Sequence, residues 1–206
     1  MLMTGIAKKM LMSKINGGNA VQLGETNVYA ILGSTKKGPT EFAKMAAVKN
    51  VVSDSSVPMK NVVNMPSDSY FQGYMNYEQA GDSFEETFVE FSKERFREIM
   101  EYLEFDKETP IEKMSDVALQ KMKIAVTLSR NSHVYMLDNP FKGMNATARE
   151  QIFKVIFSWA VAAQTIAIQC NSTDEVSQLV SYAVEHGGDL PVISIGMSKV
   201  LSESFA

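Results

Sequence analysis

The sequence predicts an α/β fold built on a mostly parallel sheet with helices on its faces. Short apolar runs typical of buried strands alternate along the chain with longer segments of helical periodicity. Strands are expected at residues 27–33, 134–137, 165–169 and 190–195, and helices at 40–48, 120–130, 147–161 and 174–186. One strand leads directly into a carboxylate, Asp138, at the edge where parallel sheets place their polar groups. This alternation favours parallel strands joined by helical crossovers.

Residues 77–105 form an acidic stretch that is predicted to be helical. Ser83 and Glu86 have the spacing of a capping box, in which two side chains satisfy free N–H groups at a helix start. Apolar residues recur at helical spacing, and a second helix is expected to begin after Ser92. We therefore expect a helical lobe attached to the sheet.

The length of 206 residues fits a single domain. Within it, residues 67–118 are assigned to the helical lobe, and residues 1–66 and 119–206 to the sheet core. Residues 1–26 contain short strand fragments and an Asn-Gly-Gly-Asn hairpin signal, and residues 49–59 form a link that contains Ser and Pro.

The composition is that of a cytoplasmic domain. The net charge of −4 gives no support for binding to nucleic acid. Cys170 is the only cysteine, so a disulfide framework is not expected and a reducing compartment is indicated. No run reaches the roughly 20 apolar residues that a membrane span requires. Any association with a membrane is therefore expected to pass through a partner.

A glycine-containing loop follows the first core strand and precedes a helix start. Gly33 and Gly38 stand where a phosphate-binding P-loop has its two glycines, and Thr40 stands where it has its hydroxyl. The lysine expected before Thr40 is replaced by Pro39, which removes an ammonium group and one backbone donor. The loop thus keeps the spacing of a phosphate site without its main positive charge.

The residues around this position strengthen that interpretation. Pro39 suits the first position of a helix, and Glu41 places a carboxylate in the first turn, where the helix dipole favours it. Lys36 and Lys37 are interpreted as solvated loop residues. Binding of ATP at this loop is therefore expected to be weak or absent.

Three further motifs follow in a fixed order. Residues 114–118 read Met-Ser-Asp-Val-Ala, residues 134–140 read Val-Tyr-Met-Leu-Asp-Asn-Pro, and residues 143–145 read Gly-Met-Asn. Together with the glycine loop, they resemble the Leu-Ser-Gly-Gly-Gln signature, the strand ending in Leu-Asp-Glu-Pro and the following loop of ABC-transporter ATPases. The nearest resemblance is to the short bacterial ATPases of drug- and peptide-export type. It implies a P-loop NTPase-like fold with a helical lobe and a trimmed antiparallel β-lobe.

The resemblance also assigns roles to single positions, most of which have lost their chemistry. Asp138 takes the place of the carboxylate on the Mg²⁺ side, with a hydrogen bond to nearby backbone as its alternative role. Asn139 replaces the catalytic Glu, Asn171 replaces the His that holds the γ-phosphate, and Ser67 replaces a Gln or carboxylate. Asn cannot accept a proton at neutral pH, and His133 and His186 are expected to face solvent. No catalytic residue is therefore expected; the vestigial nucleotide-site positions are Gly33, Gly38, Thr40 and Ser115, and the vestigial metal position is Asp138.

The signature segment carries a separate expectation. In the family, the signature glycines let the backbone approach the γ-phosphate bound by a partner subunit. Here Asp116 and Val117 add a negative charge and a branched side chain at those positions, and Ser115 is expected to be the N-cap of the helix that follows.

The resemblance implies partners as well. They are an integral-membrane transporter subunit and, in a homodimer or heterodimer, another ABC ATPase subunit; nucleic acid is not among them. The leading hypothesis is a non-hydrolysing structural or regulatory subunit without a cofactor. The alternatives are a divergent active ATPase, which would use ATP and Mg²⁺, and a soluble binding or decoy module.

The segment of residues 67–77, Ser-Asp-Ser-Tyr-Phe-Gln-Gly-Tyr-Met-Asn-Tyr, is rich in aromatic side chains. Aromatic and Met side chains are enriched at protein interfaces. The segment is therefore either a docking surface for the transporter partner or a seal between the two lobes, and both interpretations stay open at this point.

Overall fold

The computed structural model describes residues 13–14, 28–32, 62–66, 71–132, 134–159, 165–186, 190 and 192–194. Their strands form one sheet in the order β1-β6-β2-β5-β4-β3, and each of its strand pairings is parallel. The strands are β1 (Ser13–Lys14), β2 (Val28–Leu32), β3 (Val62–Asn64), β4 (Val134–Asp138), β5 (Thr165–Cys170) and β6 (Val192–Ser194). The predicted α/β fold with a mostly parallel sheet is confirmed.

The central strands are apolar because both faces of the sheet are covered. All five residues of β2 and the first four of β4 are buried. Helix α6 (Ala146–Trp159) connects β4 to β5, and helix α7 (Thr173–Glu185) lies between β5 and β6 in the sequence. Helix α7 packs against β2 and β5. Because these crossovers make the strands parallel, the carboxyl ends of strands that are distant in the sequence lie at the same edge of the sheet.

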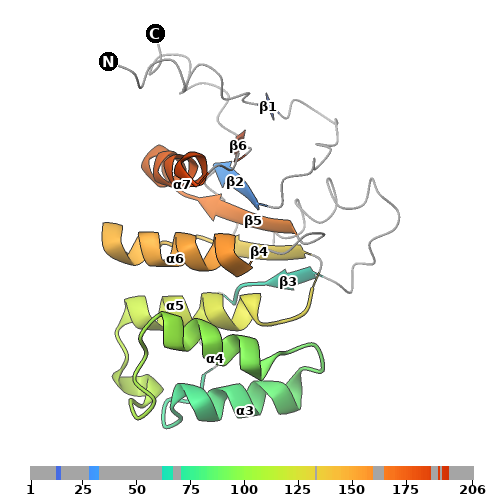
Figure 1. Ribbon diagram of the computed structural model, residues 1–206, viewed down its shortest axis with the longest axis vertical. Coiled ribbons are helices and arrows are strands. Elements are labelled where there is room, and N and C mark those ends of the chain that lie inside the picture. The colour runs from blue at the N-terminus through green and yellow to red at the C-terminus, as the bar shows by residue number, and fades with distance from the viewer. Residues whose placement is uncertain are drawn as a thin grey trace.

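Three further helices form the expected helical lobe. They are α3 (Tyr77–Thr87), α4 (Lys93–Tyr102) and α5 (Asp116–Leu128), with the short 3₁₀ helix η3 (Ile111–Lys113) between α4 and α5. Figure 1 shows α3, α4 and α5 stacked at the end of the molecule opposite α7. Helix α5 contacts α4 on one side and both α6 and β4 on the other. It therefore joins the lobe to the sheet, and the predicted division after residue 118 falls inside this helix.

The trimmed antiparallel β-lobe was expected within residues 1–66, and most of that segment lies outside the described residues. Its first described strand, β1, pairs in parallel with β6, with Ser13 opposite Ile193. The predicted helix at residues 40–48 and the hairpin signal at residues 16–19 also lie outside the described part of the chain. The antiparallel lobe thus remains a prediction.

The start of α3 differs from the sequence-based expectation. The Asn76 side chain accepts a hydrogen bond from the Gln79 N–H at 2.9 Å, and the Gln79 side chain accepts one from the Asn76 N–H at 3.1 Å. This pair is the capping box of α3. The predicted box at Ser83 and Glu86 is wrong, because Ser83 lies inside the helix, where its carbonyl accepts a bond from the Thr87 hydroxyl at 2.7 Å. Two local signals competed, and the earlier one starts the helix.

The helix starts expected after Ser92 and Ser115 are confirmed. The Ser92 hydroxyl accepts a hydrogen bond from the Arg95 N–H at 3.2 Å, which caps α4. Helix α5 begins at Asp116, four residues before the predicted helix at 120–130.

A charged contact fastens the α3–α4 turn to the end of α5. The Arg130 guanidinium donates to the Glu90 carboxylate, with the Nε contact at 2.9 Å, and lies 4.4 Å from the centre of the Phe88 ring. The hydrogen bond from Arg130 holds the pKa of Glu90 below its ordinary value. The backbone joins at the same place, because Phe91 and Arg130 form an antiparallel bridge.

The C-terminus of α4 contains a non-glycine residue in the left-handed conformation. Glu104 has φ +58° and follows the C-cap residue Leu103. The Phe105 N–H donates to the Met100 carbonyl at 3.1 Å, and the Glu104 N–H donates to the Glu101 carbonyl at 3.0 Å. This is the Schellman pattern, whose left-handed position is most often Gly.

Glu104→Gly is therefore expected to stabilise the chain by about 0.5–1 kcal/mol, because glycine adopts this conformation without the steric cost of a Cβ. Chemical denaturation of the variant and the parent chain measures the difference. Unchanged or lower stability would show that the Glu104 side chain contributes more to the fold than its conformation costs.

Candidate nucleotide site

The carboxyl ends of β2, β4 and β5 meet at one edge of the sheet. The strands are parallel and end at Leu32, Asp138 and Cys170. Asp138 lies opposite Gln169 in the register of β4 and β5, and Gln169 lies opposite Ile31 in that of β5 and β2. In open α/β sheets, ligands bind outside this edge. The edge is therefore the candidate site.

The P-loop positions follow β2 directly in the sequence. Strand β2 ends at Leu32, one residue before Gly33. Nine residues to which the sequence analysis gave a role lie outside the described part of the chain: Gly33, Lys36, Lys37, Gly38, Pro39, Thr40, Glu41, Ser67 and His133. Their assigned roles stay predictions.

Asp138 ends β4 as a half-buried carboxylate. Among the described residues, no hydrogen bond or ion pair to its side chain is formed, so the expected bond to nearby backbone is absent there. Burial raises the pKa of Asp138 above its ordinary value. A desolvated carboxylate without a partner has the properties of a cation ligand. However, the described residues contain no group of three or more acidic, His or Cys side chains that could hold a metal ion.

Asn139, the next residue, is held by its backbone. It adopts φ +47°, a conformation that Asn tolerates better than most residues with a side chain. Its carbonyl accepts hydrogen bonds from the Gln120 side chain at 3.0 Å and from the Lys142 N–H at 3.3 Å. The structure thus gives Asn139 a conformational role in the turn after β4, which the sequence alone did not indicate.

Ser115 caps α5, as predicted. Its hydroxyl accepts a hydrogen bond from the Ala118 N–H at 3.2 Å, and Asp116 places its carboxylate in the first turn. Val117 faces the loop after β4, since its Cγ2 lies 3.8 Å from the point that a Cβ on Gly143 would occupy. Gly143 itself has φ +73°. At the start of α5, the Ala118 N–H therefore has its hydrogen-bond acceptor within the chain, and Val117 contacts the loop after β4.

Asn145 is a helix cap that was not predicted from the sequence. Its side-chain oxygen accepts a hydrogen bond from the Ala148 N–H at 2.9 Å at the start of α6. The available signal was an Asn just before the predicted helix, which is a favoured N-cap residue. Asn145 therefore serves local structure at the start of α6.

Asn171 follows β5 and is exposed. Its N–H donates to the buried Glu175 carboxylate at 2.9 Å, and Ser172 caps α7 by accepting from the Glu175 N–H at 3.2 Å. His186 is exposed as expected, although its ring stacks on Tyr182 with centroids 4.1 Å apart. The contacts of Asn171 and His186 among the described residues are with Glu175 and Tyr182, so they do not place either side chain next to Asp138 as a base.

The aromatic segment of residues 67–77 divides between the two interpretations. Tyr77 is fully buried in the helical lobe, and Phe71 and Met75 pack against the core. Tyr74 is 70% exposed. Most of the aromatic and Met side chains among the described residues 71–77 therefore seal the lobe, and Tyr74 is the exposed one of them.

Cys170 is fully buried at the end of β5. Burial raises the pKa of its thiol to about 12, so the thiolate is not formed at neutral pH. Among the described residues, no helix is both long and apolar enough to cross a membrane.

Comparison with solved structures identifies the architecture. A protein from Pyrococcus furiosus assigned as an ABC transporter (ATP-binding protein) superposes with a TM-score of 0.56 at 15% identity, over 71% of this chain and 78% of its own. A protein assigned as a cobalt transport ATP-binding protein gives 0.56 at 14% identity, over 79% of this chain and 65% of its own. The RNase-L inhibitor gives 0.53 at 18% identity, over 76% of this chain but only 30% of its own.

The sequence itself gives no match to a protein-family model or to a curated protein. At these identities the structural likeness establishes the fold alone. The described sheet and helices thus share the fold of the solved ABC ATP-binding proteins.

Proposed function

We propose that the chain is a degenerate, non-hydrolysing ABC ATPase-like subunit that serves as a structural or regulatory partner of a membrane ABC transporter. The observation that carries this proposal is Asn139. It occupies the position after the β4 carboxylate, has no group that can take a proton, and is held in a left-handed turn by Gln120. A positioned general base contributes about 10²–10⁴-fold in rate, and this position lacks one.

The signature helix supports the same proposal. Asp116 adds a negative charge at the start of α5, where a close approach to a phosphate would be needed, and Ser115 is occupied by capping the helix. A phosphate contact that lacks its charged donor loses about 1.5–3 kcal/mol per hydrogen bond. Such a subunit would pair with itself or with another ABC ATPase and reach a membrane through an integral transporter subunit.

One observation favours the alternative of a divergent active ATPase. The Asp138 carboxylate is desolvated and accepts no bond within the described residues, as a cation ligand would before binding. If ATP and Mg²⁺ bind, Gly33, Gly38 and Thr40 are the positions that would face the phosphates and Asp138 the metal. Mg²⁺ would supply charge neutralisation to the bound phosphates.

Titration of the full chain with Mg-ATP in a calorimeter separates the two proposals. The degenerate subunit is expected to give no binding heat up to millimolar nucleotide, because Pro39, Glu41 and Asp116 each remove or oppose a phosphate contact. Micromolar affinity would overturn it in favour of the active alternative. Co-purification from native membranes then identifies the partner. Recovery of the chain in the cytosol alone would count against a transporter role.

A further inference from the structure

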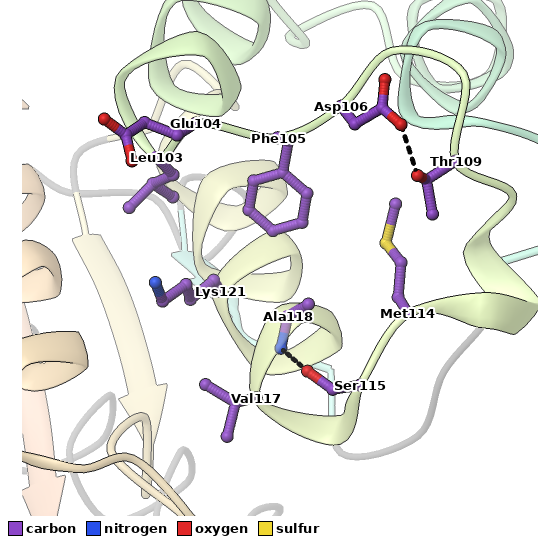
Figure 2. Close-up of a pocket in the computed structure, with 10 residues that line it drawn as sticks. All are labelled: Leu103, Glu104, Phe105, Asp106, Thr109, Met114, Ser115, Val117, Ala118 and Lys121. Carbon is purple, nitrogen blue, oxygen red and sulfur yellow. Dashed lines mark hydrogen bonds between the residues drawn. The ribbon is translucent and has the colours of Figure 1, made fainter.

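A pocket of about 290 Å³ lies between the loop after α4 and the first half of α5. We call it the α5 pocket. Its apolar lining includes Phe105, Met114, Val117 and Ala118. Figure 2 shows the Phe105 ring over α5 in the middle of the pocket, with Met114 beside it. All four side chains are half-buried, so this surface is open to solvent.

The charged side chains at the rim of the α5 pocket differ in their hydrogen-bond partners. Lys121 donates to the Gln151 side chain of α6 at 2.6 Å, which directs its ammonium group towards the sheet core. Asp106 accepts a hydrogen bond from the Thr109 hydroxyl at 2.7 Å. Glu104 is exposed, and its carboxylate takes part in no hydrogen bond or ion pair among the described residues. Glu104 interacts electrostatically with Lys121 across the rim, and its exposed carboxylate stays accessible to a ligand.

The backbone of Glu104 also adopts a conformation that is unfavourable for a residue with a side chain. It occupies the left-handed site at the end of α4, where Gly is the usual residue. A strained residue at the rim of a pocket is a reason to consider a function for its side chain.

The lobe around the pocket is strongly acidic. Residues 71–128, which include the whole of α3, α4 and α5, contain thirteen Asp and Glu against seven Lys and Arg, a net charge of −6. The whole chain carries −4, so the remainder is net positive. A surface of one sign raises the rate at which oppositely charged partners associate. The charge of the lobe therefore complements a cationic partner.

We infer that the α5 pocket docks a polypeptide segment of a partner protein in which a large apolar side chain is flanked by Lys or Arg. The apolar side chain would lie on Phe105, Met114, Val117 and Ala118, as anchor residues do in interface pockets. The cationic flank would meet Glu104 and the acidic lobe. This inference goes beyond the proposed function, because it states the chemistry of the segment that the pocket binds and not which protein carries that segment.

The test titrates labelled peptides into the full chain and follows fluorescence anisotropy and amide NMR shifts. The probe KKLFKK is expected to bind, with its shifts concentrated in the residues that line the α5 pocket. Removal of the anchor in KKGSKK is expected to weaken binding at least about tenfold, and EELFEE is expected not to bind. Equal binding of KKLFKK and KKGSKK would overturn the inference, since attraction would then be unspecific.

Variants of the chain locate the site. Glu104→Gly is expected to weaken KKLFKK about threefold, as for an exposed ion pair, while the thermal midpoint rises, so unfolding cannot explain the loss. The matched control is Glu98→Gln, which removes an exposed charge of α4 that does not line the pocket, and binding should stay within about twofold. An equal loss in both variants would contradict the inference.

Ala118→Phe fills the pocket and is expected to reduce binding at least about tenfold. Unchanged binding would overturn the assignment of the site. Self-association of the chain that disappears in Ala118→Phe would show that a second copy is the occupant, which also contradicts a separate partner. Because these measurements use no nucleotide and no membrane, their failure would leave the test of the proposed function unaffected.

Discussion

Tyr135→Phe is expected to lower the free energy of unfolding by about 1–3 kcal/mol. Tyr135 is fully buried in β4. Its hydroxyl donates to the Arg130 carbonyl at 2.6 Å and accepts from the Ser132 N–H at 3.2 Å. Removal of the hydroxyl deprives the Arg130 carbonyl and the Ser132 N–H of this hydrogen-bond partner. An unsatisfied buried polar group costs more free energy than the net gain from its hydrogen bond. The bonds also fix the connection from α5 to β4.

Tyr77→Phe is the matched control. Tyr77 is equally buried, but its hydroxyl has no hydrogen-bond partner among the described residues. Its ring packs edge-on against Phe96 and Phe105, with centroids 6.3 and 6.4 Å away, and these contacts are kept by Phe. This substitution is expected to be neutral or to stabilise by up to about 1 kcal/mol, because a buried unpaired hydroxyl is removed.

Denaturant titration of the two variants and the parent measures both effects. For a chain of this length, each kcal/mol corresponds to a shift of about 2–4 °C in the thermal midpoint. Equal stability changes in Tyr77→Phe and Tyr135→Phe would show that the hydroxyl contacts do not decide the outcome.

Asn139→Glu is expected to leave ATP hydrolysis at background, even though it restores the residue type that the family uses as a base. The P-loop lysine is still replaced by Pro39, and the γ-phosphate His position is still Asn171. A base alone cannot accelerate a reaction whose phosphates are not held in place, because catalysis of phosphoryl transfer depends on positioning and charge stabilisation.

The same substitution is expected to cost about 1 kcal/mol of stability. Residue 139 has φ +47°, and Glu tolerates this conformation less well than Asn. A phosphate-release assay and a denaturation curve on the same preparation measure the two effects. Turnover above background would mean that the phosphates already bind correctly, and Asn139→Asp, with a shorter carboxylate, provides the control for a change in charge.

The elements with strong local signals were predictable. Strand β2 was expected at residues 27–33 and is observed at Val28–Leu32, and α7 was expected at 174–186 and is observed at Thr173–Glu185. Both follow from apolar runs and helical periodicity that need no knowledge of the fold. The capping role of Ser115 was predictable for the same reason, because an N-cap bond closes within three residues.

Local signals failed where two of them competed or where a backbone angle decided the role. Asn76 and Ser83 both precede a plausible first turn, and the structure starts α3 at the earlier one, with Tyr77 and Ala80 buried. The sequence identified Asn139 as a missing base but not as a left-handed residue bonded to Gln120. A hydrogen bond across nineteen positions is not encoded in any local pattern.

The sequence by itself determined the alternation of strands and helices and the caps of α4 and α5, because each of these is a property of neighbouring residues. Only the tertiary structure decided the strand order, the burial that raises the pKa of Asp138, and the α5 pocket between the loop after α4 and α5. These depend on contacts between segments that are distant in the chain, and the free energy of such contacts is set by packing and desolvation in the folded protein.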